Sequence, residues 1–143
     1  MTIRQMLDRK GHDVWSVDSE ATVFDALRLM ADKNIGTVVV LKAGELVGIF
    51  SERDYARKII VLKRPSKEVT VRALMTARVV CVRPEQTADD CMALMTDKRV
   101  RYLPVLEEDR VIGMVSIGDV VRELISEHQF TIEQLENYIS SAD

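Results

Sequence analysis

Hydrophobic residues recur along the chain with the two spacings that mark helices and strands. Val23, Ala26 and Met30 repeat at the spacing of one helical face, which predicts an amphipathic helix with that face in a core. Downstream, two nearly unbroken apolar runs flank a short turn, and such runs indicate strands that are covered on both faces. In chain order the pattern predicts a strand at 14–17, a helix that includes 23–30, strands at 37–41 and 46–50, and a helix at 52–62.

The same order of elements occurs a second time. A constant shift of 65 positions aligns residues 22–60 with residues 87–125 without a gap. Such self-similarity marks a repeat, and each predicted sheet is too small to be stable alone, so the two copies are expected to pack together. In the second copy the pattern predicts a strand at 79–82, a helix at 87–98, strands at 102–106 and 110–115, and a helix at 117–127.

The linker and the tail complete the predicted organisation. Pro65 lies in a short basic segment between the copies, and this segment has little reach, so the copies are expected to form one pseudo-twofold unit. The tail carries Ile132, Leu135 and Tyr138 on one face of a further amphipathic helix, whose apolar stripe needs the module or a second subunit as a partner. The sequence therefore predicts an α/β fold with repeat 1 at 1–65, repeat 2 at 66–128 and a C-terminal helix at 129–143.

Composition narrows the class of protein. The 143 residues are 47% hydrophobic and 30% charged, which is typical of a globular domain. A net charge of −3 argues against a nucleic-acid partner, and no apolar run approaches the roughly 20 residues of a membrane helix. Asp8 lies in an N-terminus without a secretory apolar stretch, which predicts a cytoplasmic protein. The chain has only two cysteines, Cys81 and Cys91, and two histidines, which are too few ligands to predict a zinc or iron–sulfur site.

Each copy ends its last strand in the motif Gly-x-x-Ser-x-x-Asp, formed by Gly48, Ser51 and Asp54 in the first copy. At the start of a helix, Ser-x-x-Asp resembles a capping box, which is a sufficient structural explanation for one occurrence. A helix N-terminus with free amides also binds phosphate, and a nearby carboxylate can accept both hydroxyls of a ribose. The second occurrence, at Ser116 and Asp119, favours a binding role in addition to capping.

The duplicated β-α-β-β-α order resembles the tandem CBS-domain family (cystathionine-β-synthase domain, or Bateman module) in its stand-alone bacterial form. The segments that carry the resemblance are 48–54 (GIFSERD), 113–119 (GMVSIGD) and 100–105 (VRYLPV). The resemblance implies a regulatory module, not an enzyme, that binds an adenosine-containing ligand in clefts between the two copies. AMP is the first candidate, and ATP, NAD(H) and S-adenosylmethionine are alternatives; no metal is required.

The resemblance also implies roles for individual residues. Asp54 and Asp119 would hold the ribose, and Ser51 and Ser116 would approach phosphate or ribose. Adenine would lie against the segments that enter the strands, and cations beside the motif would bind phosphate. The adenine candidates are Ser16, Val17, Ile35, Gly36, Thr37, Cys81, Val82, Val100, Arg101, Tyr102 and Pro104, and the phosphate candidates are Lys33, Arg53, Lys98, Arg99 and Arg101.

The two copies differ beside the motif. Asn34 corresponds to Arg99, and Gly36 corresponds to Arg101. The two clefts are therefore expected to differ in affinity or in ligand. The ring of Tyr102 either stacks on a base or fills the core of a dimer, and the sequence leaves both roles open.

Three functions remain open from the sequence. A sensor would act through an effector protein in trans, because the chain has no catalytic or DNA-binding domain. An interaction module with degenerate clefts would serve as a homodimer, paired through the helices at 23–30 and 88–95 as the family resemblance implies. A nucleotide hydrolase with Asp54 or Asp119 as base is disfavoured, because a P-loop, a Gly-x-Ser-x-Gly elbow and a Ser-His-acid set are missing from the sequence.

Overall fold

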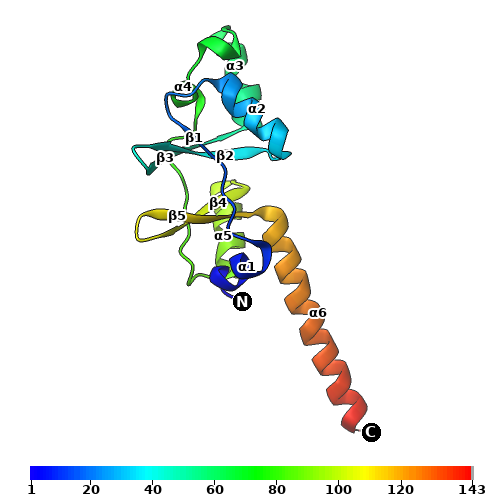
Figure 1. Cartoon of the computed structure of the whole chain (residues 1–143). Helices are drawn as coiled ribbons and strands as arrows, with labels where there is room; N and C mark the ends of the chain where they lie inside the picture. Colours follow the sequence, from blue (N-terminus) through cyan, green and yellow to red (C-terminus); the bar gives the residue numbers. More distant parts are fainter. Residues whose placement is uncertain (143) are drawn as a thin grey trace.

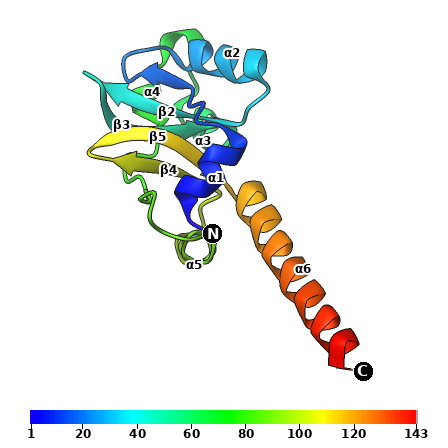
Figure 2. The same ribbon diagram turned by 60° about the horizontal axis from the view of Figure 1, so that its bottom comes forward.

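The structure is a computed structural model that describes residues 1–142, with the side chains of residues 1–139. Two small sheets lie next to each other in the middle of the molecule, where β3 contacts β5, and helices cover their outer faces (Figures 1 and 2). One long helix, α6, extends away from the sheets and ends far from them. The predicted α/β class and the paired repeats are confirmed.

The first repeat contains every element that the hydrophobic pattern predicts. Strand β1 pairs parallel to β2, and β2 pairs antiparallel to β3 across a tight turn at Ala43 and Gly44, both with positive φ. Such left-handed residue pairs match the twist of the flanking strands. The elements are α1 (Ile3–Lys10), β1 (Ser16–Asp18), α2 (Val23–Lys33), β2 (Thr37–Lys42), β3 (Glu45–Ser51), α3 (Glu52–Leu62), η1 (Ser66–Glu68) and α4 (Val71–Leu74).

The second repeat departs from the first at its beginning. The strand predicted at 79–82 is wrong, because a single parallel bridge to β4 takes its place. In the first repeat, the amides of Ser19 and Val39 donate backbone hydrogen bonds of 2.9 and 3.1 Å that tie β1 to β2. Their counterparts are Pro84 and Pro104, which have no N–H to donate. The remaining elements are α5 (Ala88–Lys98), β4 (Tyr102–Glu107), β5 (Arg110–Ser116) and α6 (Ile117–Ala142).

The helix that precedes each repeat in the sequence packs in the hydrophobic core of the other repeat. Ile3 and Leu7 of α1 are fully buried in the core of the second repeat, against side chains of α5, β4 and β5. Val71 and Leu74 of α4, which follow the first repeat in sequence, are buried in its core instead. Each half therefore depends on a helix that precedes the other half's sheet in the chain. The boundaries placed at residues 65 and 128 stay a prediction.

Glycines in the two motifs allow these helices to approach the sheets. A Cβ built on Gly113 of β5 would lie 2.6 Å from Cδ2 of Leu7 in α1, which is too close for two carbon atoms. A Cβ on Gly48 of β3 would meet Met75 and would lie 3.1 Å from the carbonyl oxygen of Thr76. The first residue of the Gly-x-x-Ser-x-x-Asp motif therefore has a packing role.

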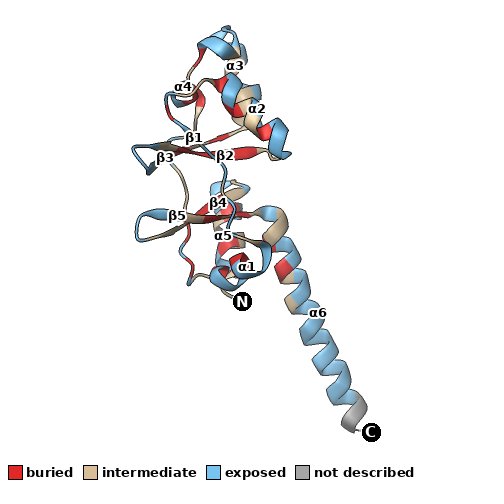
Figure 3. Ribbon diagram, in the orientation of Figure 1, coloured by how far each residue is buried: buried red, intermediate tan, exposed pale blue. Residues whose placement is uncertain are grey.

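Helix α6 replaces the two helices that the sequence predicts at 117–127 and 131–138. Its 26 residues run without a break, since no glycine or proline interrupts residues 119–142. The first turns pack on the second repeat through Val120, Glu123 and Leu124, whereas every side chain from residue 128 to residue 139 is exposed (Figure 3). Within residues 1–142, no helix combines the length and hydropathy that crossing a membrane requires.

We expect Gly113→Ala to lower the free energy of unfolding by about 1–3 kcal/mol, because the fully buried Leu7 would have to move. The matched control is Gly118→Ala in α6, whose added Cβ would lie 3.4 Å from the guanidinium of the exposed Arg122 side chain. This control should lose no stability and could gain up to about 1 kcal/mol. Urea unfolding of both variants tests the prediction, and equal losses would contradict it.

Candidate functional site

Both Ser-x-x-Asp motifs form the caps that the sequence predicts. Ser51 precedes α3, where its hydroxyl accepts from the amide of Asp54 at 3.1 Å and its own amide donates to the Asp54 carboxylate at 3.0 Å. Ser116 and Asp119 exchange the same two hydrogen bonds at 3.2 and 2.9 Å at the start of α6. Each carboxylate thus stands at the positive end of a helix and is held there by its backbone.

Asp119 lies in a cationic environment. Its two carboxylate oxygens accept hydrogen bonds from Lys10 at 2.6 Å and from Arg122 at 2.8 Å, and its side chain is only 11% exposed. Burial raises the pKa of Asp119, but hydrogen bonds from Lys10 and Ser116 outweigh it, so the pKa lies below its usual value of 3.8. The group is therefore an anion at neutral pH, with its charge compensated by two cations.

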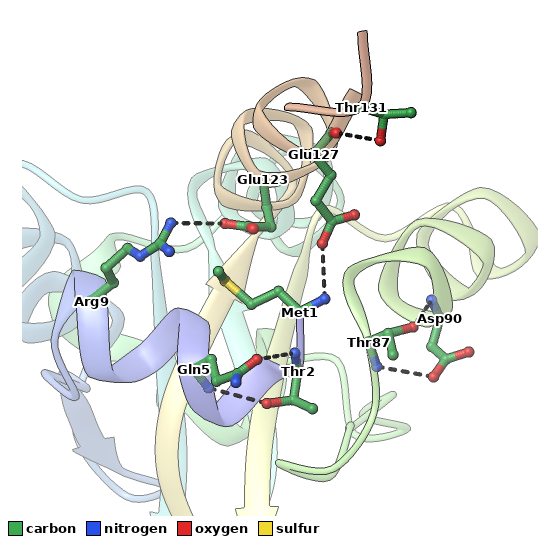
Figure 4. Close-up of polar contacts among 9 residues, drawn as sticks. All are labelled: Met1, Thr2, Gln5, Arg9, Thr87, Asp90, Glu123, Glu127 and Thr131. Carbon is green, nitrogen blue, oxygen red and sulfur yellow. Dashed lines mark hydrogen bonds and ion pairs between the residues drawn. The ribbon is translucent and has the colours of Figure 1, made fainter. Parts of the chain in front are cut away.

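A cavity of about 260 Å³ adjoins this carboxylate, between α1 and α6. Its volume is slightly below the range for small-molecule sites, which is about 300–1,000 Å³. Ion pairs hold the two helices together: Arg9 lies 3.6 Å from Glu123, and the amino group of Met1 lies 2.9 Å from Glu127 (Figure 4). The lining residues are Met6, Arg9, Lys10, Asp119, Arg122, Glu123 and Ser126.

Asp54 has different neighbours. Its Oδ1 accepts a hydrogen bond of 3.0 Å from the hydroxyl of Thr76 and lies 3.7 Å from the Nζ of Lys58. Its side chain is 16% exposed. The two acids thus occupy equivalent positions in the repeats, but Asp119 faces two cations in direct hydrogen-bond contact and Asp54 faces a hydroxyl and a more distant lysine.

The strand-entry segments lie directly against the motifs. The carbonyl of Gly36 accepts from the first amide of α3 at 3.1 Å, and the equivalent carbonyl of Arg101 accepts from the first amide of α6 at 2.8 Å. The hydroxyl of Tyr102 lies 3.3 Å from the position of a Cβ on Gly36, so this side chain reaches across from the second repeat to the first. The segments around Gly36 and Tyr102 are therefore brought together, while the side chain of Arg101 is exposed.

Several predicted site residues make contacts within the protein, and their binding roles stay predictions. Thr37 is buried and donates its hydroxyl to the carbonyl of Phe50 at 3.2 Å, and Lys33 lies 4.3 Å from the ring centroid of Trp15. Arg99 ends α5 in the left-handed conformation, with a φ of 55°, as Asn34 ends α2 with a φ of 54°. The other predicted residues are exposed (Ser16, Arg53, Lys98), half-buried (Val17, Ile35, Cys81, Val100) or buried (Val82, Pro104).

The two thiols are unreactive in character. Burial raises the pKa of Cys81, and burial followed by the charge of Asp90 raises the pKa of Cys91 to about 12. Both groups are thus neutral thiols at neutral pH. Among the described residues, no group of three or more histidine, cysteine or acidic side chains is arranged to hold a metal ion.

The sequence prediction missed the cations that surround Asp119. Arg122 lies one helical turn after Asp119 on the same face of α6, and this local spacing was readable from the sequence. Lys10 is 109 positions away from Asp119, so no local pattern could have identified it. It reaches the site because α1 packs on the second repeat.

Comparisons with known proteins agree with this architecture. Residues 6–61 and 71–126 each match the sequence model of the CBS domain. The CBS domain-containing protein CBSX3, mitochondrial, of Arabidopsis thaliana is 43% identical over 148 aligned residues, which cover 96% of this chain and 71% of that protein. The crystal structure of the CBS domain protein NE2398 is 46% identical, has a TM-score of 0.84, and is matched over 87% of this chain and 98% of that chain.

A more distant structure shares the fold alone. The CBS domain pair of MJ0100, solved in complex with 5′-methylthioadenosine and S-adenosyl-L-methionine, is 21% identical with a TM-score of 0.78. The match covers 89% of this chain and 98% of that chain.

Two repeats with exchanged first helices and a capped acid in each define a paired regulatory module. The chain belongs to the CBS-domain family, because the family model matches it twice over most of its length. Members of this family are typically regulatory proteins and not enzymes.

The lowered pKa of Asp119 predicts a pH-dependent contribution to stability. A depressed folded-state pKa stabilises the fold above the unfolded value of 3.8, and this contribution disappears as the pH falls through the folded-state pKa. At neutral pH, Asp119→Asn should lower the free energy of unfolding by about 1–3 kcal/mol, because the bonds to Lys10 and Arg122 lose their charge.

Urea unfolding of wild type and Asp119→Asn over a range of pH measures this difference. The difference should shrink once the pH falls below 3.8. Asp109→Asn is the matched control, since Asp109 is exposed in a turn with a φ of 65° that asparagine tolerates. A difference between wild type and Asp119→Asn that does not change with pH would contradict the prediction.

Proposed function

We propose that this protein is a sensor of an adenosine-containing ligand, with AMP as the first candidate, and that its main site is the cavity beside Asp119. The observation that carries the proposal is a largely buried carboxylate bonded to two cations, Lys10 and Arg122, beside a cavity of about 260 Å³ that Arg9 also lines. A nucleotide combines ribose hydroxyls, which donate to a carboxylate, with phosphates, which accept from lysine and arginine. The MJ0100 complex supports the ligand class.

Ligand binding would exchange partners within this group. Lys10 and Arg122 hold the Asp119 carboxylate at 2.6 and 2.8 Å. The two hydroxyls of a ribose can take over this carboxylate, and the released cations can turn to the phosphate. The exchange keeps every charge paired, which a buried site requires. The adenine base would lie against the strand-entry segment at 100–102, which adjoins the same motif.

The same exchange provides a route for a signal. Lys10 belongs to α1 and Arg122 belongs to α6, and both are hydrogen-bonded to Asp119. A ligand that binds one arrangement of these helices more tightly shifts the population towards it. The end of α6 extends from the module, and an effector protein acting in trans could read its position. The Asp54 site would bind with a different affinity, since its surroundings carry less positive charge.

An interaction module without a physiological nucleotide is the second candidate. The observation in its favour is the long exposed part of α6, which contains large apolar side chains at residues 130–139. In this function the protein would be a homodimer, and its motifs would serve only as helix caps. Binding measurements separate the two candidates.

Isothermal titration with AMP tests the sensor function. Wild type should bind AMP, and Asp119→Asn should bind it at least about 10-fold more weakly, because hydrogen bonds to a charged group contribute roughly 1.5–3 kcal/mol. Asp109→Asn should bind as wild type does, since that acid lies in an exposed turn. Removal of either ribose hydroxyl from AMP should weaken binding to wild type but have little further effect on Asp119→Asn.

Lys10→Ala separates the contribution of the phosphate. This substitution should weaken the binding of AMP more than the binding of adenosine, because adenosine has no phosphate for the lysine to bind. Protein freed of co-purified ligand is also titrated with ATP, NADH and S-adenosylmethionine. Absence of binding for all four adenosine ligands would contradict the sensor function and leave the interaction module.

A further inference from the structure

Helix α6 carries an apolar stripe that the described residues of its own chain leave exposed. The stripe begins with Val121 and Ile125 beside the module and continues with Ile132, Leu135 and Ile139 on the projecting part. The last three side chains are 54%, 58% and 63% exposed. Figures 1 and 2 show this part of the helix standing clear of both sheets.

The spacing of the stripe follows a coiled-coil heptad. Ile125, Ile132 and Ile139 recur every seven residues, which places β-branched residues at the a positions. Val121, His128 and Leu135 occupy the d positions between them. β-branched residues at a together with leucine at d favour two parallel strands, and Leu135 meets the second condition at one of the three d positions. The pattern therefore favours a second helix of the same kind as the partner.

The stripe can contact another helix because α6 packs on the second repeat through a different side. Val120 is fully buried and Leu124 is half-buried against the second repeat. Val121 and Ile125 each follow one of these residues by one position. Their side chains therefore point about 100° further around the helix. Those two are 39% and 52% exposed, so the stripe remains open even where α6 touches the module (Figure 3).

The charges of α6 are compatible with self-pairing. Glu123, Glu127 and Glu133 fall at f, c and b positions, on the side of the helix away from the stripe. Positions e and g, which flank the seam, carry Arg122, Leu124, Gln129, Thr131 and Tyr138 and a single acid at residue 136. In a parallel pair, a g residue faces the e residue five positions later on the other helix, so residue 136 faces Thr131. No two acids are opposed across that seam.

We propose that two copies of this chain pair through α6 as a parallel two-stranded coiled coil with its seam along Val121, Ile125, His128, Ile132, Leu135 and Ile139. The parallel arrangement brings the second repeats of the two copies to the same end of the coil. The two Asp119 sites then lie at the same end of the coil, since Asp119 is in the first turn of α6. This pairing depends only on α6 and stands whether or not the module binds a nucleotide.

Sedimentation equilibrium with Leu135→Glu tests the proposed seam. Wild type should associate at micromolar concentration, and Leu135→Glu should raise the dissociation constant at least about 100-fold, because it places a charge from each copy in an apolar seam. The matched control is Phe130→Glu, which replaces a side chain that is 63% exposed on the same helix but lies at an f position. This control should associate as wild type does.

Cross-linking tests the parallel orientation. Under mild oxidation, Leu135→Cys should form a disulfide between copies, because two d residues face each other across a parallel seam. Phe130→Cys should form little, and since both variants keep Cys81 and Cys91, the comparison accounts for the native thiols. Circular dichroism should show the same fold for every variant, because residues 130 and 135 are exposed.

Three results would overturn the proposal. The first is a monomeric wild type at these concentrations, which would leave the stripe for a different protein. The second is an equal mass for wild type and Leu135→Glu, which would place any pairing elsewhere, for example on α2 and α5. The third is an intact dimer in which Leu135→Cys does not cross-link, which would exclude the parallel arrangement.

Discussion

The packing of α1 on the second repeat is the contact on which the rest of the structure depends. Leu7 fits against Gly113 because the strand offers no Cβ at that point, and Ile3 and Leu7 are completely buried there. This contact joins the first residues of the chain to the core of its second half. It also places the end of α1, and with it Lys10, within hydrogen-bond distance of Asp119. The core and the candidate site are thus consequences of one close approach.

The two repeats have similar backbone scaffolds, but different residues surround the acid in each. In each motif the serine hydroxyl accepts a hydrogen bond from the backbone amide of the acid, so the two acids are held in equivalent ways. The surroundings then diverge, because Asp119 receives Lys10 from an exchanged helix of eight residues, whereas the four-residue α4 brings the hydroxyl of Thr76 to Asp54. A similar divergence affects the sheets, where prolines reduce the first strand of repeat 2 to a bridge. The pseudo-twofold symmetry therefore describes the scaffold better than it describes the sites.

Most of the scaffold was readable from the sequence because its signals are local. The face of α2 at Val23, Ala26 and Met30 is buried as predicted, and the runs that flank Ala43 and Gly44 form a hairpin. The capping boxes follow equally from a spacing of three residues. The failure at 79–82 also had a local cause, since Pro84 and Pro104 cannot donate to a ladder.

The residues that contact the two acids were harder to predict from the sequence, because long-range packing brings them together. The exchange of α1 and α4 has no signature in hydrophobic spacing, so Lys10 and Thr76 could not be assigned to their acids. Arg99 was predicted as a phosphate donor, yet its position is explained by the left-handed end of α5. The segments at Gly36 and Arg101 lie beside the motifs, as the hydrogen bonds from α3 and α6 show, and their contact with adenine stays a prediction.

A crystal structure of the protein with AMP is the most direct test of the central claim, that Asp119 holds a ribose in the cavity between α1 and α6. The account predicts both ribose hydroxyls within hydrogen-bond distance of the Asp119 carboxylate, with Lys10 and Arg122 turned towards the phosphate. AMP bound at another place, with the Lys10–Asp119 pair still intact and the cavity empty, would contradict it.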